Sequence, residues 1–302
     1  MLTDLTDTTT GDIRAALARA QGQLGGPATG VVLNLIIVTD ESGQHDAVRA
    51  ASQASREHPC RVLGVIARES RTASRLEAEI RSGEGTPGQT VLLRLYGPMS
   101  EHADSVVMPL LVSDTPVVTW WPRGGPSIPS GDPLGMLAQR RVTDAASVPE
   151  PAEALIALAI GYRPGDTDLS WTRATPWRSL LAATLDQPHG EITGGAVAAE
   201  PRNPSADLIA SWLSGRLGAP FTRDVSGGPG ITEVQFTTSD GDITIARPDG
   251  RTATLSRPDQ PDRRVALHRR DVAELMAEEL RRLNPDEVYG EALTHFAAVA
   301  GR

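Results

Sequence analysis

Four short apolar runs, rich in β-branched residues and separated by longer polar segments, constrain the fold more than any other feature of the sequence. Near-continuous apolar runs of this length are typical of strands that are buried on both faces of a sheet. Because helical segments connect these strands, the neighbouring strands are expected to run parallel with right-handed crossovers. The four predicted strands are residues 31–39, 60–67, 90–96 and 116–121.

The segments around these strands favour helices. Within residues 101–111, Val106, Val107, Leu110 and Leu111 recur at the spacing of one helical face. The predicted helices of this half are residues 12–23, 46–56, 72–81, 101–111 and a closing helix at 151–160. The first half is therefore predicted to be an α/β domain of residues 1–165, with an open, mainly parallel sheet flanked by helices.

Proline, glycine and polar residues at 162–168 indicate a domain boundary. Beyond it, short runs of alternating character are separated by hairpin turn signals at residues 239–241 and 248–250. The predicted elements are helices at 177–185 and 205–217, strands at 192–198, 231–238, 242–246 and 252–255, and helices towards residue 299. Residues 166–302 are thus predicted to be a smaller α+β domain with short antiparallel strands and terminal helices.

Charge and composition exclude several classes of protein. The 302-residue chain has a net charge of -9, and it contains no lysine, so its 29 basic residues are all arginine. A lysine Schiff base and a P-loop lysine are therefore excluded. An acidic chain without a basic tail predicts no binding to nucleic acid or to an anionic membrane. Without a long apolar run or the pattern of an export signal, the chain is expected to be cytoplasmic.

Ligands of an open parallel sheet gather where its strands end. Two segments there stand out, residues 95–105 and 114–123, because a tight turn opens a helix and an arginine lies nearby. Free backbone N–H groups and an arginine suit a phosphorylated metabolite. The residues of this predicted pocket are Tyr96, Gly97, Ser100, His102, Ser105 and Arg123. The alternative interpretation is that Ser100 only caps the helix, with His102 and Asp104 on its solvated face.

Aromatic residues make up only 4% of the chain, yet many of them cluster between the fourth predicted strand and the second domain. A buried core at the domain junction is one interpretation. A surface for a protein partner is the other, because Trp, Tyr and Arg dominate binding hot spots. The residues of this predicted partner surface are Trp120, Trp121, Tyr162, Trp171, Arg173, Trp177 and Arg178.

Cys60 is the only cysteine, so an internal disulfide cannot form. It lies where a turn enters the second predicted strand. A buried structural thiol is a common fate for such a residue. The alternative is an intermolecular redox thiol activated by His58 or Arg61.

The motifs of familiar active sites are missing. The sequence has neither a Gly-x-Ser-x-Gly elbow nor a Gly-x-Gly-x-x-Gly motif after a strand. The glycine string at residues 227–230 contains Pro229, which argues against a phosphate cradle. Six histidines are scattered without metal-ligand spacing. No catalytic residue, cofactor or metal is therefore predicted.

Many ordered segments together resemble the OpcA family, the glucose-6-phosphate dehydrogenase assembly proteins of actinobacteria and cyanobacteria. The similarity covers nearly the whole chain. It rests on residues 57–61, 93–98, 102–107, 114–122, 132–135, 140–144, 165–171, 175–178, 186–188, 278–283 and 286–289. Several of these segments contain tryptophan, which makes the similarity far more specific than a single motif.

The resemblance implies a non-catalytic protein that binds glucose-6-phosphate dehydrogenase and promotes its active oligomer, supporting NADPH production in the oxidative pentose phosphate pathway. It also implies thiol redox control in cyanobacterial relatives, which an internal disulfide cannot provide here. A second hypothesis is a sensor domain that binds a sugar phosphate or a nucleotide. A third is a sugar-phosphate enzyme in which His102 and Asp104 converge with another group.

Overall fold

A computed structural model describes residues 2–23, 31–68, 73–81 and 89–300. The chain forms two compact units. Unit 1 comprises Met1–Thr143 and Val272–Pro285, and unit 2 comprises Asp144–Asp271 and Asp286–Arg302. Each unit thus combines a long segment with a short one from near the C-terminus. Among the described residues, no helix combines the length and the apolar character that crossing a membrane requires.

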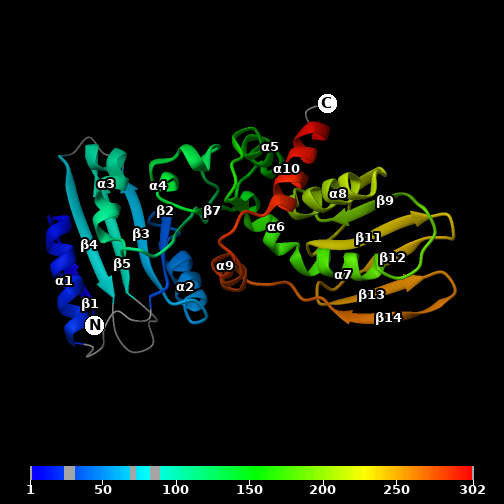
Figure 1. The fold of residues 1–302 in the computed structure, drawn as a ribbon, viewed down its shortest axis with the longest axis horizontal. Helices are drawn as coiled ribbons and strands as arrows, with labels where there is room; N and C mark the ends of the chain where they lie inside the picture. The colour runs from blue at the N-terminus through cyan, green and yellow to red at the C-terminus, as the bar shows by residue number, and fades with distance from the viewer. Residues whose placement is uncertain (1, 24–30, 69–72, 82–88, 301–302) are drawn as a thin grey trace. The chain divides into compact units, whose positions relative to one another are not determined.

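The sheet of unit 1 is mainly parallel. Its strands are β1 (Leu2–Leu5), β2 (Leu33–Thr39), β3 (Cys60–Arg68), β4 (Arg75–Arg81), β5 (Thr90–Tyr96), β6 (Val117–Trp120) and β7 (Arg140–Thr143). They follow the order β1-β4-β5-β3-β2-β6-β7 (Figure 1). From β5 to β7 in this order, each neighbouring pair is parallel. Strand β4 pairs antiparallel with β5, and β1 pairs antiparallel with β4. The predicted open parallel sheet is confirmed, and all four predicted strands lie in it.

The helices of unit 1 are shorter and more broken than expected. They are α1 (Thr10–Gln23), α2 (Gln44–Ala54), η1 (Gly97–His102), α3 (Ala103–Val107), η2 (Met108–Leu110), η3 (Pro129–Gly131), α4 (Pro133–Met136) and α9 (Val272–Arg281). The single helix predicted at 101–111 is wrong, because this stretch is a short α-helix between two 3₁₀ turns. Pro109 begins the last of these turns, since proline has no N–H to continue the α-helix.

The helix predicted at 72–81 is also wrong. Residue 72 lies outside the described residues, and residues 75–81 form strand β4, which pairs antiparallel with β5. Leu76, Ala78 and Ile80 are buried, whereas the charged residues between them are not. This alternation has the period of a strand. Good helix formers such as Leu, Glu and Ala hid the pattern, and pairing with β5 overrode their propensity.

Both faces of the unit 1 sheet are buried. Ile36 of β2 packs in a core with Ile13 of α1 and Val107 of α3. Its neighbours Leu35 and Ile37 are also fully buried and, by the alternation of a strand, face the other side. Helix α2 contacts β2, β3 and α9 outside that core. The near-continuous apolar runs of the sequence are explained by this two-sided burial.

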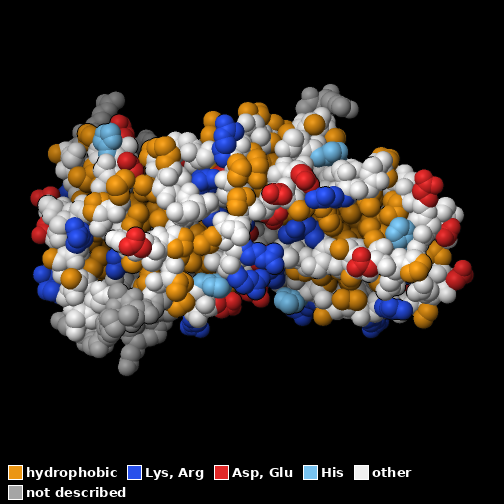
Figure 2. Space-filling view, in the orientation of Figure 1, with side chains coloured by type: hydrophobic (Ala, Val, Ile, Leu, Met, Phe, Trp, Pro, Cys, Tyr) orange, Lys and Arg blue, Asp and Glu red, His pale blue; other side chains and the backbone are white. Residues whose placement is uncertain are grey.

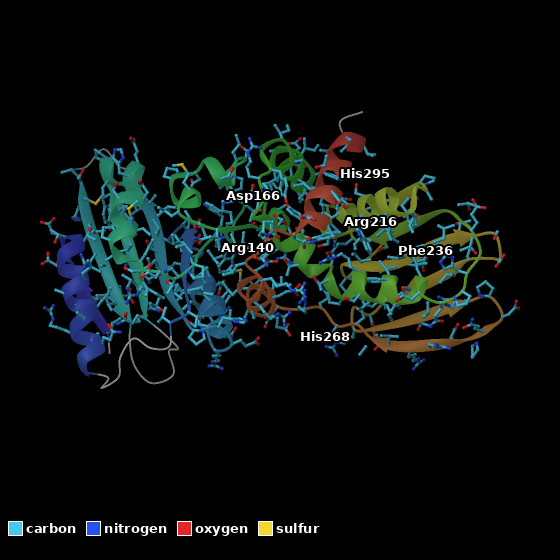
Figure 3. The ribbon with its side chains drawn as sticks, viewed as in Figure 1. Arg140, Asp166, Arg216, Phe236, His268 and His295 are labelled. Carbon is cyan, nitrogen blue, oxygen red and sulfur yellow. The ribbon has the colours of Figure 1, made fainter. Side chains whose placement is uncertain are left out.

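A buried ion pair holds the C-terminal helix α9 in unit 1. Arg140 of β7, labelled in Figure 3, donates from Nε to Oε2 of Glu279 at 2.7 Å and from Nη1 to the carbonyl of Asn284 at 2.9 Å. Both charged side chains are at most 5% exposed. Leu275, Met276 and Leu280 of the same helix are buried. The apolar face of α9 therefore packs in unit 1, although the residues that precede and follow this short segment of unit 1 belong to unit 2.

Unit 2 contains a mainly antiparallel sheet. The strands of this sheet are β9 (Ile192–Ala199), β10 (Phe221–Val225), β11 (Ile231–Thr238), β12 (Ile243–Ala246), β13 (Thr252–Arg257) and β14 (Gln260–Ala266), and the short strand β8 (Asp166–Asp168) of unit 2 is not part of it. The six strands of the sheet follow the order β10-β9-β11-β12-β13-β14, with only the β10–β9 pair parallel (Figure 1). The predicted antiparallel sheet is confirmed. Strands β10 and β14 had no prediction, because polar residues at the sheet edges obscure the period-two pattern.

Helices cover one face of this sheet. The helices of unit 2 are η4 (Ala145–Ser147), α5 (Pro151–Gly161), α6 (Leu169–Arg173), α7 (Thr175–Leu185), α8 (Pro204–Leu217) and α10 (Glu287–Ala300). Trp177 and Leu181 of α7 and Ile209 of α8 share one core with Val234 and Phe236 of β11. Alternate strand residues turn to the opposite face, which we call the open face. Ala196, Gln235, Thr244 and Ser256 form a partly exposed row across it.

Helix α5 belongs to unit 2, whereas the division predicted at residue 165 placed it in the N-terminal domain. Leu155 and Leu158 of α5 pack with Leu208 of α8 and with Tyr289 and Leu293 of α10. This second core draws its helices from three distant stretches of the chain. A boundary inferred from local proline and glycine residues has no access to such contacts.

Candidate functional site

The carboxyl edge of unit 1, where β2, β3, β5 and β6 end, contains residues of the predicted ligand pocket. Tyr96 ends β5, and its hydroxyl donates to Oε2 of Glu77 at 2.8 Å. The guanidinium carbons of Arg75 and Arg68 lie 4.2 and 5.5 Å from the centre of its ring. The ring and the hydroxyl of this tyrosine are therefore both in contact with side chains of the protein itself.

The turn that follows Tyr96 is closed by its own hydrogen bonds. Gly97 has a φ of +63°, which favours glycine, and the hydroxyl of Ser100 donates to the Gly97 carbonyl at 2.7 Å. Ser100 thus stabilises the 3₁₀ turn, and the α3 N-cap is His102, without a side-chain cap bond. His102 and Ser105 are exposed. The structure brings Tyr96, Gly97 and Ser100 together and leaves the other two residues of this segment facing solvent.

Arg123 follows β6, which is separated from β5 by two strands. It donates to the hydroxyl of Ser42 at 2.7 Å and to Asp40 at 3.4 Å. Hydrogen bonds from Ser42 and from the Gly43 N–H, with the nearby charge of Arg123, lower the pKa of Asp40. Arg123 is therefore held by the turn after β2 and not directed at the Tyr96 segment.

The acid next to Asp40 completes this arrangement. Glu41 pairs with Arg68 at 2.7 Å and with Arg94 at 3.2 Å. Although partial burial raises the pKa of Glu41, the hydrogen bond from Arg68 and the charge of Arg94 lower it overall. Three arginines at the carboxyl edge are thus matched by two adjacent carboxylates of one turn.

The four tryptophans of the predicted partner surface are buried. Trp120, Trp121, Trp171 and Trp177 are between 1% and 5% exposed. The surface interpretation is therefore corrected for these side chains, because a ring in the protein core cannot contact a partner. Tyr162, Arg173 and Arg178, from the same prediction, are partly exposed.

The aromatic residues also lie in separate clusters. Trp120 and Trp121 belong to unit 1, and the others belong to unit 2. Trp171 packs against Tyr289 and Trp212, with ring centres 6.1 and 6.4 Å apart. Its indole N–H donates to Asp286 at 2.9 Å, and the guanidinium of Arg178 lies 3.8 Å from its ring centre. Trp171 therefore anchors the helical core of unit 2.

Cys60 lies fully buried at the start of β3. Its sulfur is 2.7 Å from the hydroxyl of Ser55. Burial raises the pKa of the thiol from 9.0 to about 11, against a smaller opposing effect of the Ser55 hydrogen bond. The reactive thiolate is thus disfavoured at neutral pH, and the geometry favours the structural interpretation of this residue.

The structure also shows a pocket, entirely within unit 2, that the sequence did not predict. It encloses about 510 Å³, counted with the space at its opening. We call it the arginine pocket. Its lining comes from the end of α6, the start of α7, the start of α8, β11, the end of β12 and the segment after β14, with Arg173, Pro176, Trp177, Asn203, Ser205, Gly230, Ile231, Arg247, His268, Arg269 and Arg270. Figure 2 shows blue and pale blue side chains close together over the segment that follows β14, and Figure 3 labels His268 there.

Arg247 is the most buried cation of the arginine pocket, at 4% exposure. It donates from Nη1 to the Leu267 carbonyl at 3.0 Å and from Nη2 to the Ile231 carbonyl at 2.9 Å. Its guanidinium carbon lies 5.0 Å from the centre of the Trp177 ring. Burial, and then the charge of Arg269, lower its pKa to about 10, so the side chain is still a cation at neutral pH.

The other cations of the arginine pocket have different partners. Arg173 forms two parallel bonds with the buried carboxylate of Asp144, at 2.6 and 2.7 Å. Arg270 donates to the carbonyl of Thr172. Arg269 is exposed, and it pairs with no acidic side chain in the part of the chain that the structure describes.

The N-terminus of α8 contributes the remaining polar groups. Asn203 is the N-cap and accepts the Ala206 N–H at 3.0 Å, and Pro204 opens the helix. Ser205 follows in the first turn and lines the pocket. Pro204 has no N–H, and the N–H groups of Ala206 and Asp207 are bonded to Asn203, so α8 adds the positive end of its helix dipole to the pocket.

Sequence reasoning missed this pocket for a physical reason. Its cations come from three separate places in the chain, and only the run His268-Arg269-Arg270 is a local signal. Gly230, the last residue of the glycine string, lines it with a φ of +65°. The proline in that string led the sequence analysis away from the site.

The fold defines a two-unit protein with an open α/β sheet and a largely antiparallel sheet that helices cover on one face. Within the described residues, no group of three or more His, Cys, Asp or Glu side chains could hold a metal ion. Two family models match the sequence of this chain. Residues 51–160 match the glucose-6-phosphate dehydrogenase subunit N-terminal domain, and residues 164–293 match the C-terminal domain of the same subunit. The chain therefore belongs to the OpcA family of glucose-6-phosphate dehydrogenase assembly proteins.

Other comparisons add little. A solved structure, described as an oxidoreductase from Sinorhizobium meliloti, aligns with 89% of this chain and 95% of its own at 9% identity and a TM-score of 0.47. A similarity at this level carries no argument about fold or function. No curated protein matches the sequence significantly.

Proposed function

We propose that this chain is a non-catalytic subunit that binds glucose-6-phosphate dehydrogenase and promotes its active oligomer, in support of NADPH production by the oxidative pentose phosphate pathway. The observation that carries the proposal is the pair of family models, which cover the two halves of the chain and are both named for a subunit of that enzyme. The proposed site of action is the cytoplasm, as expected from the sequence.

An assembly subunit acts by differential binding. If it binds the competent oligomer more tightly than the incompetent forms, it shifts the population toward the competent oligomer by the ratio of the two affinities. No bond needs to be made or broken by the subunit. The carboxyl edge of unit 1 supports this role, because Arg68, Arg94 and Arg123 are engaged by Asp40 and Glu41 and are not presented to a substrate.

The open face of unit 2 is the proposed contact surface. The row of Ala196, Gln235, Thr244 and Ser256 is small, uncharged and partly exposed, and interface centres are depleted in charged residues. A sheet face that presents short side chains is flat and allows close approach of a partner. Tyr162, Arg173 and Arg178 remain candidates from the predicted partner surface, since they are partly exposed.

The test uses the full chain and the glucose-6-phosphate dehydrogenase of the same organism. We expect the two proteins to co-elute in size-exclusion chromatography, with a larger dehydrogenase oligomer and a higher specific activity than the enzyme has alone. Equal activity and equal oligomer size with and without the chain would contradict the proposal.

A pair of variants tests the contact surface. Thr244→Arg places a long charged side chain in the centre of the open face, and we expect it to weaken the complex by about tenfold or more, because the charge would be buried without a partner. Thr6→Arg makes the same chemical change at an exposed position of unit 1 and is the matched control. If both variants bind as wild type does, the contact lies elsewhere on the chain.

A further inference from the structure

Two cations of the arginine pocket, Arg247 and Arg269, form no ion pair with an acidic side chain among the described residues. None of the described residues that line the pocket is acidic. Arg173 has Asp144 as its partner, whereas in the described part of the chain Arg247 donates to two neutral carbonyls and lies against the Trp177 ring. A buried cation without an adjacent anion is costly, and a ligand of negative charge would relieve that cost.

The acids closest to Arg247 are occupied elsewhere. Glu200 and Asp249 act on its charge through space, without a hydrogen bond to the guanidinium. Glu200 accepts from the side chain of Asn203 at 3.2 Å. Asp249 accepts the backbone N–H groups of Arg251 and Thr252, both at 2.8 Å. The turn thus holds one oxygen of the Asp249 carboxylate, and neither Asp249 nor Glu200 forms a hydrogen bond with Arg247 in the described structure.

Two guanidiniums converge beside Gly230. A Cβ at this position would lie 3.4 Å from Nη2 of Arg247 and 3.7 Å from Nε of Arg269. The positive φ and the missing side chain therefore leave room for the two cations to approach one another. Like charges this close repel, so their juxtaposition indicates a place for an anion between or beside them.

Unpartnered donors are a second, independent observation. The indole N–H of Trp177 and Nε of Arg247 are buried and have no acceptor among the described residues. Both side chains are at most 4% exposed and line the pocket. Buried donors in folded proteins almost always have a partner, and those without one suggest an absent ligand or ion.

We infer that the arginine pocket binds a small molecule that carries a phosphate group. A phosphate has close to two negative charges and three acceptor oxygens, so it can engage guanidiniums that arrive from several directions. A carboxylate is satisfied by a single planar fork. Here the cations come from α6, the end of β12 and the segment after β14, and the N-terminus of α8 adds the positive end of its helix dipole from a fourth side. This arrangement fits the tetrahedral anion.

The pocket also has apolar lining beside its cations. Pro176, Trp177 and Ile231 supply apolar surface for the organic part of the ligand. The inference concerns unit 2 alone and does not depend on an association with the dehydrogenase.

Calorimetric titration of the full chain tests the inference. The probes are inorganic phosphate, pyrophosphate and glucose 6-phosphate, with glucose as the neutral control and citrate as the carboxylate control. We expect the phosphate-bearing probes to bind, glucose not to bind, and citrate to bind at least about tenfold more weakly than pyrophosphate. Absence of binding by all three phosphate probes would overturn the inference, and so would citrate binding as tight as pyrophosphate.

A pair of exposed arginines provides the matched variants. Arg269→Gln removes a pocket cation without disturbing the core, and we expect it to weaken phosphate binding by about tenfold, as for the loss of a charge-assisted hydrogen bond. Arg263→Gln on β14 makes the same charge change outside the pocket lining, and we expect binding within about twofold of wild type. Equal weakening by the two variants would indicate attraction to net charge only, and the site would be rejected.

Discussion

Arginines at the carboxyl edge of unit 1 and arginines in the arginine pocket of unit 2 are compensated in different ways. At the edge, Arg68, Arg94 and Arg123 face the carboxylates of Asp40 and Glu41. In the pocket, Arg247 faces two carbonyl oxygens and a tryptophan ring. Arginines at the carboxyl edge of unit 1 thus have carboxylate partners, whereas in the arginine pocket of unit 2 positive charge is left available for a ligand.

The difference teaches that cationic residues near strand ends do not by themselves define an anion site. The acids of the edge are consecutive residues in the turn after β2, where three strand ends bring arginines to them. The pocket brings its cations together from three places in the chain, and its nearby acids form hydrogen bonds with other groups. What decides availability is the hydrogen bonding of the acids, which depends on the fold.

The largest expected effect concerns Arg173, the arginine of the pocket that pairs with the carboxylate of Asp144. Asp144→Asn leaves Arg173 largely buried and without its carboxylate, and we expect the free energy of unfolding to fall by about 3 kcal/mol. Urea denaturation followed by tryptophan fluorescence measures the loss. Asp46→Asn is the control, because its pair with Arg49 is more than 70% exposed on both sides, and we expect no measurable change. Equal losses of unfolding free energy in the two variants would show that burial does not make the Asp144–Arg173 pair more stabilising than the Asp46–Arg49 pair.

The burial of Cys60 in unit 1 can be tested by measuring stability at alkaline pH. Because burial raises the pKa of Cys60 to about 11, the unfolded chain loses the thiol proton between about pH 9 and 11 while the folded chain keeps it. We expect this group to lower the free energy of unfolding by about 2 to 3 kcal/mol as pH rises through that window. The contribution of Cys60 is the difference in the pH dependence of the free energy of unfolding between the wild-type protein and Cys60→Ala.

The same thiol offers a direct chemical check. At neutral pH we expect iodoacetamide to leave the folded protein unmodified and to label the urea-unfolded chain at one site, as mass spectrometry would show. Rapid labelling of the folded protein would mean that this part of unit 1 is open, and it would revive the redox interpretation of Cys60.

The smallest expected effect lies at the carboxyl edge itself. Arg123→Gln removes an exposed pair with Asp40, whose side chains are 53% and 59% accessible, and we expect a loss under about 0.5 kcal/mol in urea denaturation. The variant is also expected to bind the phosphate probes as wild type does. A marked loss of phosphate binding would show that the predicted pocket of unit 1, and not the arginine pocket, holds the ligand.

The sequence predicted the central strands well because two-sided burial leaves a plain signal. Residues 33–39 and 60–66 are almost uninterrupted apolar runs, and all their side chains are buried or partly buried. Strand β4 was taken for a helix because its charged face has helix-forming residues, and only its ladder with β5 identifies it. Edge strand β14 is exposed along nearly its whole length and gives no periodic signal.

The candidate sites were harder to predict than the strands. Gly97 and Ser100 were found where the sequence placed them, at a strand end, but their bonds close the turn. The tryptophans were recognised as a cluster, whereas their burial in two separate units depends on contacts with residues such as Tyr289, more than 100 positions away. Such partners cannot be read from local patterns.

The amino-acid sequence by itself determined the class of fold, the family, the absence of lysine chemistry and the impossibility of an internal disulfide. These follow from local periodicity, from motif order and from composition, none of which requires knowing which distant residues meet. Only the tertiary structure decided that α9 returns to unit 1, that the tryptophans are core, and that Arg247 and Arg269 meet beside Gly230. The reason is physical, because burial and electrostatic compensation are properties of neighbours in space.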